Sequence, residues 1–401
     1  MRTLVISDLH LGSSSRADLL RRSELREPLL RAVAEVDRVV LLGDVLELRH
    51  GPARGALAVA RPFFEELGRA LDGRELVLVA GNHDHALVDP WLAVRAELEQ
   101  AEPLRLEQLL EPQEASPLVA RLAQWAEPAR TRFAYPGLWI RPDVYAMHGH
   151  YLDCHLTVPT IERLSVGVMS RLLGRPAQSF ASVGDYEAVT GPMYAWRHAL
   201  ARDAMTGDAL NGIGTVNAWR ALGGTGERDA AARGVAPSRR SLLLARLRRD
   251  AIVHGFPLAV AALNRAGIGP LRAEVSLSEL RRAGLRAMGE VASRLGLDDC
   301  HVVFGHTHRA GPLAGDDVRE WHRPPTVPGG SPGARLVNVG CWTYDAIFLS
   351  GPDAESPYWP GTAVVVEDSG PPRLDRLLLD RTRAELSPRD GRDAALTPRQ
   401  A

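Results

Sequence analysis

Five short segments of the chain carry side chains of the types that bind metal ions. They contain Asp8 and His10, Asp44 and Glu47, Asn82 to Asp84, His148 and His150, and His306 and His308. Carboxylate, imidazole and amide oxygen together suit Mn, Fe, Zn or Ni better than Ca or Mg alone. Two such ions about 3.5–4 Å apart need a shared ligand, usually a carboxylate. The residue types therefore indicate a pair of divalent metal ions.

Each segment ends or follows an apolar run that is typical of a buried strand. The predicted strands are residues 2–7, 37–44, 74–81, 142–149 and 301–306. Ligands of open α/β sheets gather beyond the carboxyl ends of the strands, so we expect one shared site. Gly43, Gly81, Gly149 and Gly305 would let the backbone turn sharply beside these residues. Any one segment alone could be a plain turn or a structural histidine pair, but five in this arrangement favour a metal site.

The elements around these segments alternate between strand and helix. Predicted helices cover residues 15–36 and 53–71, a helical stretch runs from about Pro90 to Ala126, and further strands cover 334–342, 345–350 and 362–368. This alternation predicts a layered α/β domain. We assign 1–155 and 300–382 to a catalytic domain, 156–299 to a helical cap insertion with a loop at 223–234, and 383–401 to a disordered tail.

Composition narrows the classes of protein that are reasonable. The 401 residues carry a net charge of −1, so no overall field attracts nucleic acid or an anionic membrane. The three cysteines, Cys154, Cys300 and Cys341, are too far apart to suggest a disulfide framework. We expect no signal peptide, and the most apolar late stretch, Ala251–Leu263, falls short of the roughly 20 residues of a membrane span. These features predict a cytoplasmic protein.

The ordered series DLH, GD, GNHD, HGH and GHTH resembles the calcineurin-like metallophosphoesterase superfamily. The resemblance covers about Met1–His155 and Cys300–Asp380, and it implies a β-sandwich flanked by helices, with the helical insertion outside it. It implies that the first metal is held by Asp8, His10, Asp44 and His308, and the second by Asp44, Asn82, His148 and His306. Asp44 would bridge two divalent ions, with Mn²⁺ favoured and Fe, Zn or Ni as options. A hydroxide bound between them would attack phosphorus.

Other residues receive roles from the same resemblance. His83 would contact the phosphate and protonate the leaving oxygen as a general acid. Glu47 would fix the tautomer and orientation of that histidine. Asp84 is predicted to brace the loop by accepting backbone hydrogen bonds, and His150 is a candidate either for a position behind the ligands or for the substrate entrance. We expect His85 to lie at the surface or behind the ligands.

The branch of the superfamily and the substrate stay open. ISDLHLG resembles the UDP-diacylglucosamine pyrophosphohydrolases of lipid A synthesis, but that branch commonly has G-N-R-D and H-G-D where this chain has Asn82-His83-Asp84 and His148-Gly149-His150. H-G-H is similar to small bacterial phosphodiesterases, which lack so large an insertion. The insertion should overhang the site and influence substrate choice. Its segment 238–265, with five arginines between 239 and 249, suits either a phospholipid-like substrate and a membrane surface, or an amphipathic cap helix, which we favour.

The favoured function is hydrolysis of a phosphodiester or pyrophosphate bond in a small substrate, with a lipid-linked substrate as one option. A nuclease or nucleotide phosphodiesterase is the alternative. The neutral charge and few aromatic residues disfavour nucleic acid, because binding a phosphate backbone needs cationic contacts. A non-catalytic scaffold is disfavoured because every expected ligand is present. The sequence does not specify the substrate, the preference for monoesters or diesters, the metal, the oligomeric state or the role of the insertion.

Overall fold

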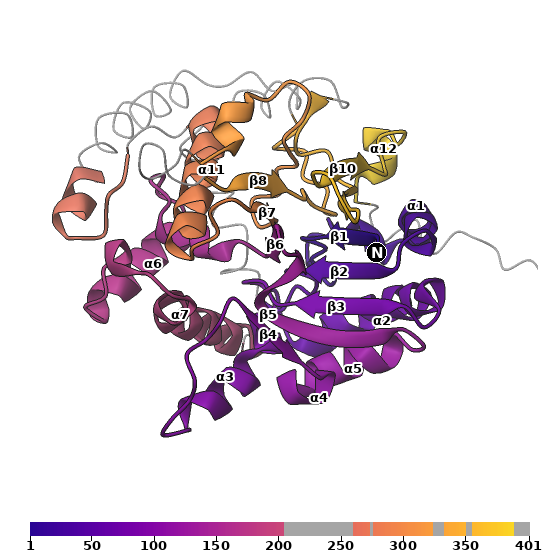
Figure 1. Ribbon diagram of the computed structural model, residues 1–401, viewed down its shortest axis with the longest axis horizontal. Helices are drawn as coiled ribbons and strands as arrows, with labels where there is room; N and C mark the ends of the chain where they lie inside the picture. The colour runs from indigo at the N-terminus through magenta and orange to yellow at the C-terminus, as the bar shows by residue number, and fades with distance from the viewer. Residues whose placement is uncertain (204–259, 273–275, 324–332, 350–354, 389–401) are drawn as a thin grey trace, which may run out of the picture.

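A computed structural model describes residues 1–203, 260–272, 276–323, 333–349 and 355–388, which form one ten-stranded mixed sheet flanked by helices (Figure 1). The strands are β1 (Thr3–Ile6), β2 (Arg38–Leu42), β3 (Glu75–Val79), β4 (Glu107–Leu110), β5 (Arg130–Arg141), β6 (Val144–Met147), β7 (His301–Phe304), β8 (Arg335–Asn338), β9 (Thr362–Val366) and β10 (Arg373–Arg376). Their order across the sheet is β10-β9-β1-β2-β3-β5-β6-β7-β8, and β4 pairs with β5.

The sheet has two parallel parts that the long strand β5 joins. β1, β2, β3 and β5 are parallel neighbours, as are β6, β7 and β8. β5 pairs with β3 through residues 130–134 and antiparallel to β6 through residues 137–141. The register shifts between Trp139 and Arg141, and such an irregularity bends a strand. One strand therefore belongs to both halves of the sheet.

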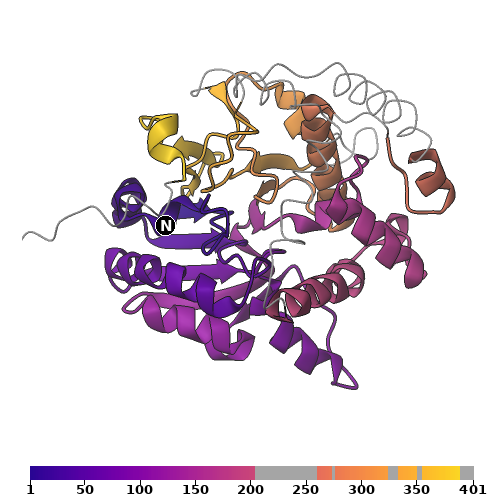
Figure 2. The ribbon, with the colours of Figure 1, turned by 180° about the vertical axis from the view of Figure 1, so that it is seen from behind.

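The two halves pack against each other and bury a shared apolar layer. Val5, Val40 and Val77 from the first half lie in the same buried cluster as Val303 and Val337 from the second. The outer face of the first half packs against α1, α2 and α5, and that of the second packs against α11, as Figure 2 shows from behind. The predicted layered α/β fold, a sandwich of strands flanked by helices, is therefore confirmed.

The helices are amphipathic and cover these outer faces. They are α1 (Ser23–Ala34), α2 (Ala53–Leu71), α3 (Asp89–Ala96), α4 (Pro112–Ala115), α5 (Pro117–Trp125), α6 (Ile161–Leu172), α7 (Val183–Asp203), α11 (Leu277–Arg294) and α12 (Arg383–Leu386). Short 3-10 helices are η1 (Leu19–Arg21), η2 (His85–Leu87), η3 (His150–Cys154), η4 (Ala177–Ser179) and η5 (Val318–Trp321). In the described part of the chain, no helix is both long and apolar enough to span a membrane.

Some predicted elements are wrong. The stretch 90–126 contains α3, β4, α4 and α5 instead of helix alone, and β5 follows it unpredicted. The sequence of β5 lacks the usual pattern of a strand, because it contains Pro136, Gly137 and three arginines. Proline and glycine are uncommon inside strands, and the arginines interrupt the apolar pattern. The predicted strand at 345–350 has a turn at 346–348. Its apolar side chains Phe348 and Leu349 pack on the core, which explains the misleading pattern.

The described residues of the predicted insertion form helices and no strand. α11 packs directly on the strands of the second half-sheet, through residues such as Met288 and Val291. The predicted loop 223–234 and the arginine-rich residues 238–259 lie outside the described residues, so the division into catalytic domain and cap stays a prediction. α12 occupies the start of the tail predicted to be disordered, and its Leu386 packs in the core; residues 389–401 lie outside the described residues.

A buried polar network joins α7 to β5, η2 and η3. Tyr135 and Tyr151 donate hydrogen bonds to one oxygen of Glu187, and His85 Nε2 lies 3.3 Å from the other. His85 Nδ1 lies 2.6 Å from Asp89 Oδ1, and of the two positions expected for His85, its burial excludes the surface. Burial lowers the pKa of His85, but its hydrogen bonds to Asp89 and Glu187 outweigh burial and raise it to about 10.

Replacing Glu187 by glutamine should lower the free energy of unfolding by about 3 kcal/mol, because it leaves a buried imidazolium and two phenols with a weaker partner. Urea unfolding of the metal-free protein measures this change.

The contribution of His85 to the free energy of unfolding depends on pH, because the pKa of His85 is raised on folding. It is fully present below the unfolded pKa of about 6.5 and is lost as the pH rises towards its folded pKa of about 10. The stability difference between wild type and His85→Gln should therefore narrow over this range.

His301→Gln is the matched control for this pH effect. Burial lowers the pKa of His301 to about 4, so this histidine stays neutral across the same range. The stability difference between wild type and His301→Gln should not change between pH 6.5 and 10. A His85→Gln difference that is equally constant would contradict the assigned charge of the network.

Candidate metal centre

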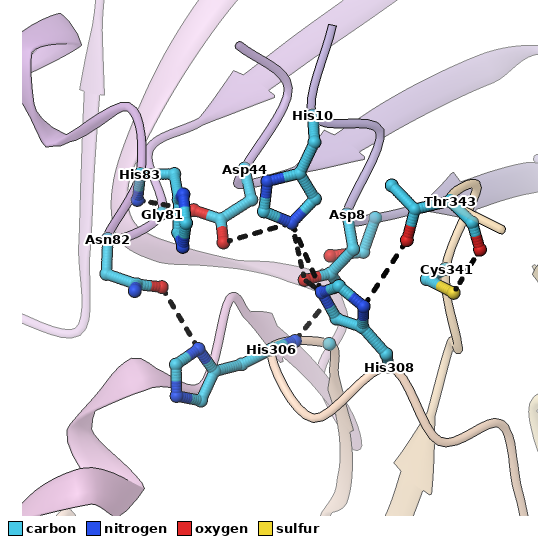
Figure 3. Close-up of polar contacts among 12 residues, drawn as sticks. Asp8, His10, Asp44, Gly81, Asn82, His83, His306, His308, Cys341 and Thr343 are labelled. Atoms are coloured by element: carbon cyan, nitrogen blue, oxygen red, sulfur yellow. Dashed lines mark hydrogen bonds and ion pairs between the residues drawn. The ribbon is translucent and has the colours of Figure 1, made fainter. Parts of the chain in front are cut away.

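The ends of five strands bring the predicted ligands into one cluster. Asp8 follows β1, Asp44 follows β2, Asn82 follows β3, His148 follows β6, and His306 and His308 follow β7. Figure 3 shows side chains from both halves of the sheet pointing towards a common space. The side chains of Asp8 and His148 are fully buried, whereas that of His308 is 31% exposed. The cluster is therefore buried at its base and reaches solvent on the side of His308.

Two groups of ligand atoms meet at Asp44. In the first group, His308 Nε2 lies 3.2 Å from His10 Nε2 and 3.3 Å from Asp8 Oδ1. In the second, Asn82 Oδ1 lies 3.1 Å from His148 Nε2 and 3.0 Å from His306 Nδ1. Asp44 Oδ2 lies 3.7 Å from His10 Nε2 and 3.3 Å from His148 Nε2. One carboxylate oxygen thus stands between both groups.

The four histidines of these groups share a hydrogen-bonding arrangement. Each places its other ring nitrogen against an acceptor: His10 Nδ1 against Glu47 Oε2 (3.2 Å), His148 Nδ1 against the Leu42 carbonyl (2.9 Å), His306 Nε2 against Asp153 Oδ2 (3.1 Å) and His308 Nδ1 against Thr343 Oγ1 (3.4 Å). A neutral imidazole donates from one nitrogen and accepts at the other. When these imidazoles are neutral, the nitrogens that face the cluster present lone pairs, which is the state that binds a metal ion.

The donor atoms fit divalent metal ions. The buried Asp8 Oδ1 accepts no hydrogen bond within the described part of the chain. The Asn82 amide oxygen faces only acceptors, namely Asp44 Oδ2 and the ring nitrogens of His148 and His306. Converging acceptors repel one another unless cations or protons lie among them. Carboxylate, imidazole and amide oxygen form a donor set typical of Mn, Fe, Zn or Ni.

The electrostatics of the cluster also favour cations. Burial lowers the pKa of His148, but the Asp44 carboxylate outweighs burial and raises that pKa to about 9. Burial raises the pKa of Asp8, yet the positive charge of His308 lowers it to about 2. The carboxylates are thus ionised and strongly attract positive charge, which protons supply when metal ions do not.

Five of the predicted ligands have left-handed backbone conformations. The φ angles are 57° at Asp8, 46° at His10, 50° at Asp44, 66° at His306 and 56° at His308. This conformation costs a residue other than glycine roughly 1–2 kcal/mol, so the surrounding structure must hold it. The Asp84 carboxylate accepts backbone hydrogen bonds from Gly81, Asp44, Val45 and Leu46. These are contacts of the bracing kind predicted for Asp84.

Two of the four glycines are required for a different reason from the one predicted. Gly43 and Gly149 have positive φ angles of 83° and 105°, as a sharp turn requires. At Gly81 and Gly305 the φ angle is ordinary, but a Cβ atom would collide with the carboxylates of Asp44 and Asp8. These two glycines therefore make space for the ligands.

His83 lies beside the cluster and is held by Glu47. Its Nδ1 lies 2.7 Å from Glu47 Oε2, and its backbone N–H donates to Asp44 Oδ1 at 2.7 Å. Glu47 contacts His10 Nδ1 through the same oxygen, so one carboxylate orients two imidazoles. Burial lowers the pKa of His83 to about 4 despite Glu47. Donation of a proton by His83 therefore requires the negative charge of a bound phosphate group to raise this pKa.

His150 is buried next to the predicted ligand His148. It is 1% exposed, and its ring lies 5.6 Å from that of His148 and 5.5 Å from that of Tyr194. Neither ring nitrogen has a hydrogen-bond partner within the described residues. The side chain thus lies behind a ligand, which is one of the two positions predicted for His150.

Three side chains of the site were not predicted, and one of them, Thr343, lies 3.4 Å from His308 Nδ1. Asp153 of η3 supports His306, and Arg49 lies beside Asn82. Asp153 carries a weak signal, since it is a lone carboxylate in an otherwise apolar stretch soon after His148. Arg49 has no motif signal, because its contact with Asn82 depends on how two strands pair.

Replacing Asp153 by asparagine should weaken Mn²⁺ binding by about tenfold to a hundredfold, because the partner that fixes the His306 tautomer is lost. Competition between the protein and a metallochromic chelator measures this affinity. Asp185→Asn, at the partly exposed start of α7 and outside the cluster, is the control and should bind Mn²⁺ as the wild type does. Equal affinities in the two variants would refute the supporting role of Asp153.

A comparison with protein families supports the same site. The model of the family described as calcineurin-like phosphoesterase matches residues 1–175, which include the first four of the five segments. A comparison with curated proteins gives no match. The matched segments supply ligand atoms from both groups, and the remaining two histidines come from β7 in the same cluster. Residues 1–175 therefore match the calcineurin-like phosphoesterase family, and this match points, together with the clustered ligand atoms, to a metal-dependent phosphoric ester hydrolase.

Proposed function

We propose that the protein uses two divalent metal ions to hydrolyse a phosphodiester or pyrophosphate bond of a small substrate. Mn²⁺ is the metal that we favour. The observation that carries this proposal is the position of Asp44 Oδ2 between two groups of inward-facing lone pairs. Asp8, His10, Asp44 and His308 would hold one ion, and Asp44, Asn82, His148 and His306 the other. When bound, such ions polarise the phosphoryl group and lower the pKa of the water that attacks it.

The chain's own residues would handle the leaving group. Glu47 orients the His83 ring through Nδ1, which leaves Nε2 to contact the phosphoryl group. In-line displacement puts the leaving oxygen opposite the attacking water. We assign to His83 the transfer of a proton to that leaving oxygen. Asp84 keeps the turns in place and does not touch the substrate.

The finer aspects of the substrate stay proposals. The net charge of −1 disfavours the nuclease alternative, and the complete set of ligands disfavours a non-catalytic scaffold. A lipid-linked substrate and peripheral membrane contact depend on the arginine-rich residues 238–259, which lie outside the described residues. The likeness to UDP-diacylglucosamine pyrophosphohydrolases depends on ISDLHLG alone. Cys154, Cys300 and Cys341 are free and buried, which is consistent with the cytoplasmic location that we propose.

The test is an assay of metal-stripped protein reloaded with Mn²⁺, on a chromogenic phosphate monoester and the matching diester in parallel. The proposal predicts metal-dependent turnover of the diester, and the ratio of the two rates gives the preference. Turnover of the monoester alone would overturn the preference for diesters. Full turnover without any metal would overturn the mechanism itself.

A further inference from the structure

Arg49 is a cation at the site without an anionic partner. It follows β2 by a few residues, and its backbone N–H donates to Glu47 Oε1 at 2.9 Å. Its Nη1 and Nη2 both lie 3.1 Å from the amide nitrogen of Asn82, so donors face a donor. Within the described residues, the guanidinium donates no hydrogen bond and has no carboxylate within 4.0 Å. A partly buried arginine is normally paired with an acceptor, so the guanidinium of Arg49 has room for an anionic partner that this part of the chain does not supply.

Turning the Asn82 amide would not resolve this conflict. The turned oxygen would accept from Arg49, but the amide nitrogen would then face His148 and His306. The group around those histidines would lose its oxygen ligand and gain a donor that competes with a cation. When the amide oxygen of Asn82 faces the two ligand groups, the guanidinium N–H groups of Arg49 stay available to donate to an anion beside Asn82.

The helical insertion holds the guanidinium in place. Arg49 Cζ lies 5.3 Å from the centre of the Tyr194 ring of α7, within the range of a cation–π contact. Tyr194 is 2% exposed, so its ring is a fixed surface. Glu162 of α6 is paired with Arg197 at 3.3 Å, and the charge of Arg49 contributes to lowering the pKa of Glu162 without lying within 4.0 Å of it. His83 follows Asn82 directly in the chain, so the charge of Arg49, 3.1 Å from the Asn82 amide, lies near the histidine assigned to the phosphate.

We infer that Arg49 binds a phosphoryl oxygen of the substrate beside Asn82 and His83, and that Tyr194 of the insertion positions it. This inference rests on the proposed function. The planar guanidinium matches two phosphoryl oxygens and remains charged at all working pH values. A fixed positive charge there balances the negative charge that develops on the phosphoryl oxygens during transfer. The insertion thus contributes to the binding of the reacting group through Tyr194.

The experiment measures the binding of inorganic phosphate to the Mn²⁺-loaded full chain by calorimetry, with metal content and thermal unfolding recorded for each variant. Arg49→Met should weaken phosphate binding by about thirtyfold, with metal content unchanged. Arg49→Lys should recover part of this loss, because the charge returns without the fork. Tyr194→Leu should weaken binding less than Arg49→Met, and Tyr194→Phe should bind as the wild type does because the ring is kept.

Arg61→Met is the matched control, since Arg61 is an exposed arginine of α2 that pairs with Glu65. It should leave phosphate binding and turnover unchanged. Wild-type phosphate affinity in Arg49→Met, with two ions still bound, would overturn the inference while the proposed function stands. Wild-type affinity in Tyr194→Leu would remove the positioning role of the insertion. A metal-loaded wild type that neither binds phosphate nor hydrolyses esters would overturn both.

Discussion

Replacing Asp44 by asparagine is expected to lower kcat/KM by about a thousandfold or more, which corresponds to roughly 4 kcal/mol of transition-state stabilisation. Asp44 Oδ2 is the atom shared by the two ligand groups, and neighbouring histidines hold the pKa of this carboxyl well below its usual range despite burial. Asparagine has the same shape but no charge, and its amide presents either a neutral oxygen or a donor to the metals. The variant should also bind fewer ions than the wild type, as elemental analysis after gel filtration would show.

Asp84→Asn is the comparison for this variant, because it is the same substitution at a fully buried carboxylate of the same site. Asp84 contacts backbone N–H groups and no ligand atom, so its loss should lower stability more than activity. We expect Asp84→Asn to retain two ions and much more activity than Asp44→Asn. Equal losses in rate, with metal content retained in both variants, would refute the assignment of Asp44 as the bridge.

Replacing His83 by asparagine should lower kcat by roughly a hundredfold to ten-thousandfold on a substrate with a poor leaving group, such as an alkyl phosphate ester. The loss should be far smaller with a nitrophenyl ester, since nitrophenolate leaves without a proton. Metal content should not change if the family pattern holds, which places His83 beside the ligands, although His10, Asp44 and His83 also lie close enough together to hold an ion. A series of esters with leaving groups of graded pKa measures this dependence.

Glu47→Gln tests the orientation of His83 separately. Glu47 contacts both His83 Nδ1 and His10 Nδ1, so its loss should affect proton transfer and one metal together. We expect reduced Mn²⁺ affinity in Glu47→Gln but not in His83→Asn. An equal loss for His83→Asn on alkyl and nitrophenyl esters would show that His83 binds the phosphate but does not protonate the leaving oxygen.

The sequence carried enough information to predict which residues meet. Asp8, Asp44 and Asn82 follow apolar strands, and parallel strands place such residues at one edge of a sheet. The histidines after β6 and β7 meet them because the second half of the sheet folds over the first. The order of the motifs and the apolar runs can be recognised in the sequence even though β5, the strand that joins the two halves, was not predicted.

Other features have no local signal. The left-handed backbone at Asp8, Asp44 and His306 arises from hydrogen bonds between distant turns, which a pattern of residues does not display. Asp153 and Arg49 act through contacts across the fold with His306 and Asn82. β5 was not predicted because proline, glycine and arginine interrupt its apolar pattern. Its length is set by pairing with neighbouring strands, which the local sequence does not show.

The most direct test of a two-metal centre is a titration of metal-stripped protein with Mn²⁺, with bound metal and hydrolysis of the diester recorded on the same samples. The account predicts that about two ions bind per chain and that turnover follows the binding of the second. Asp44→Asn should not reach this state at the same Mn²⁺ concentration. Full turnover with a single bound ion per chain would contradict a shared site and require a mechanism with one metal.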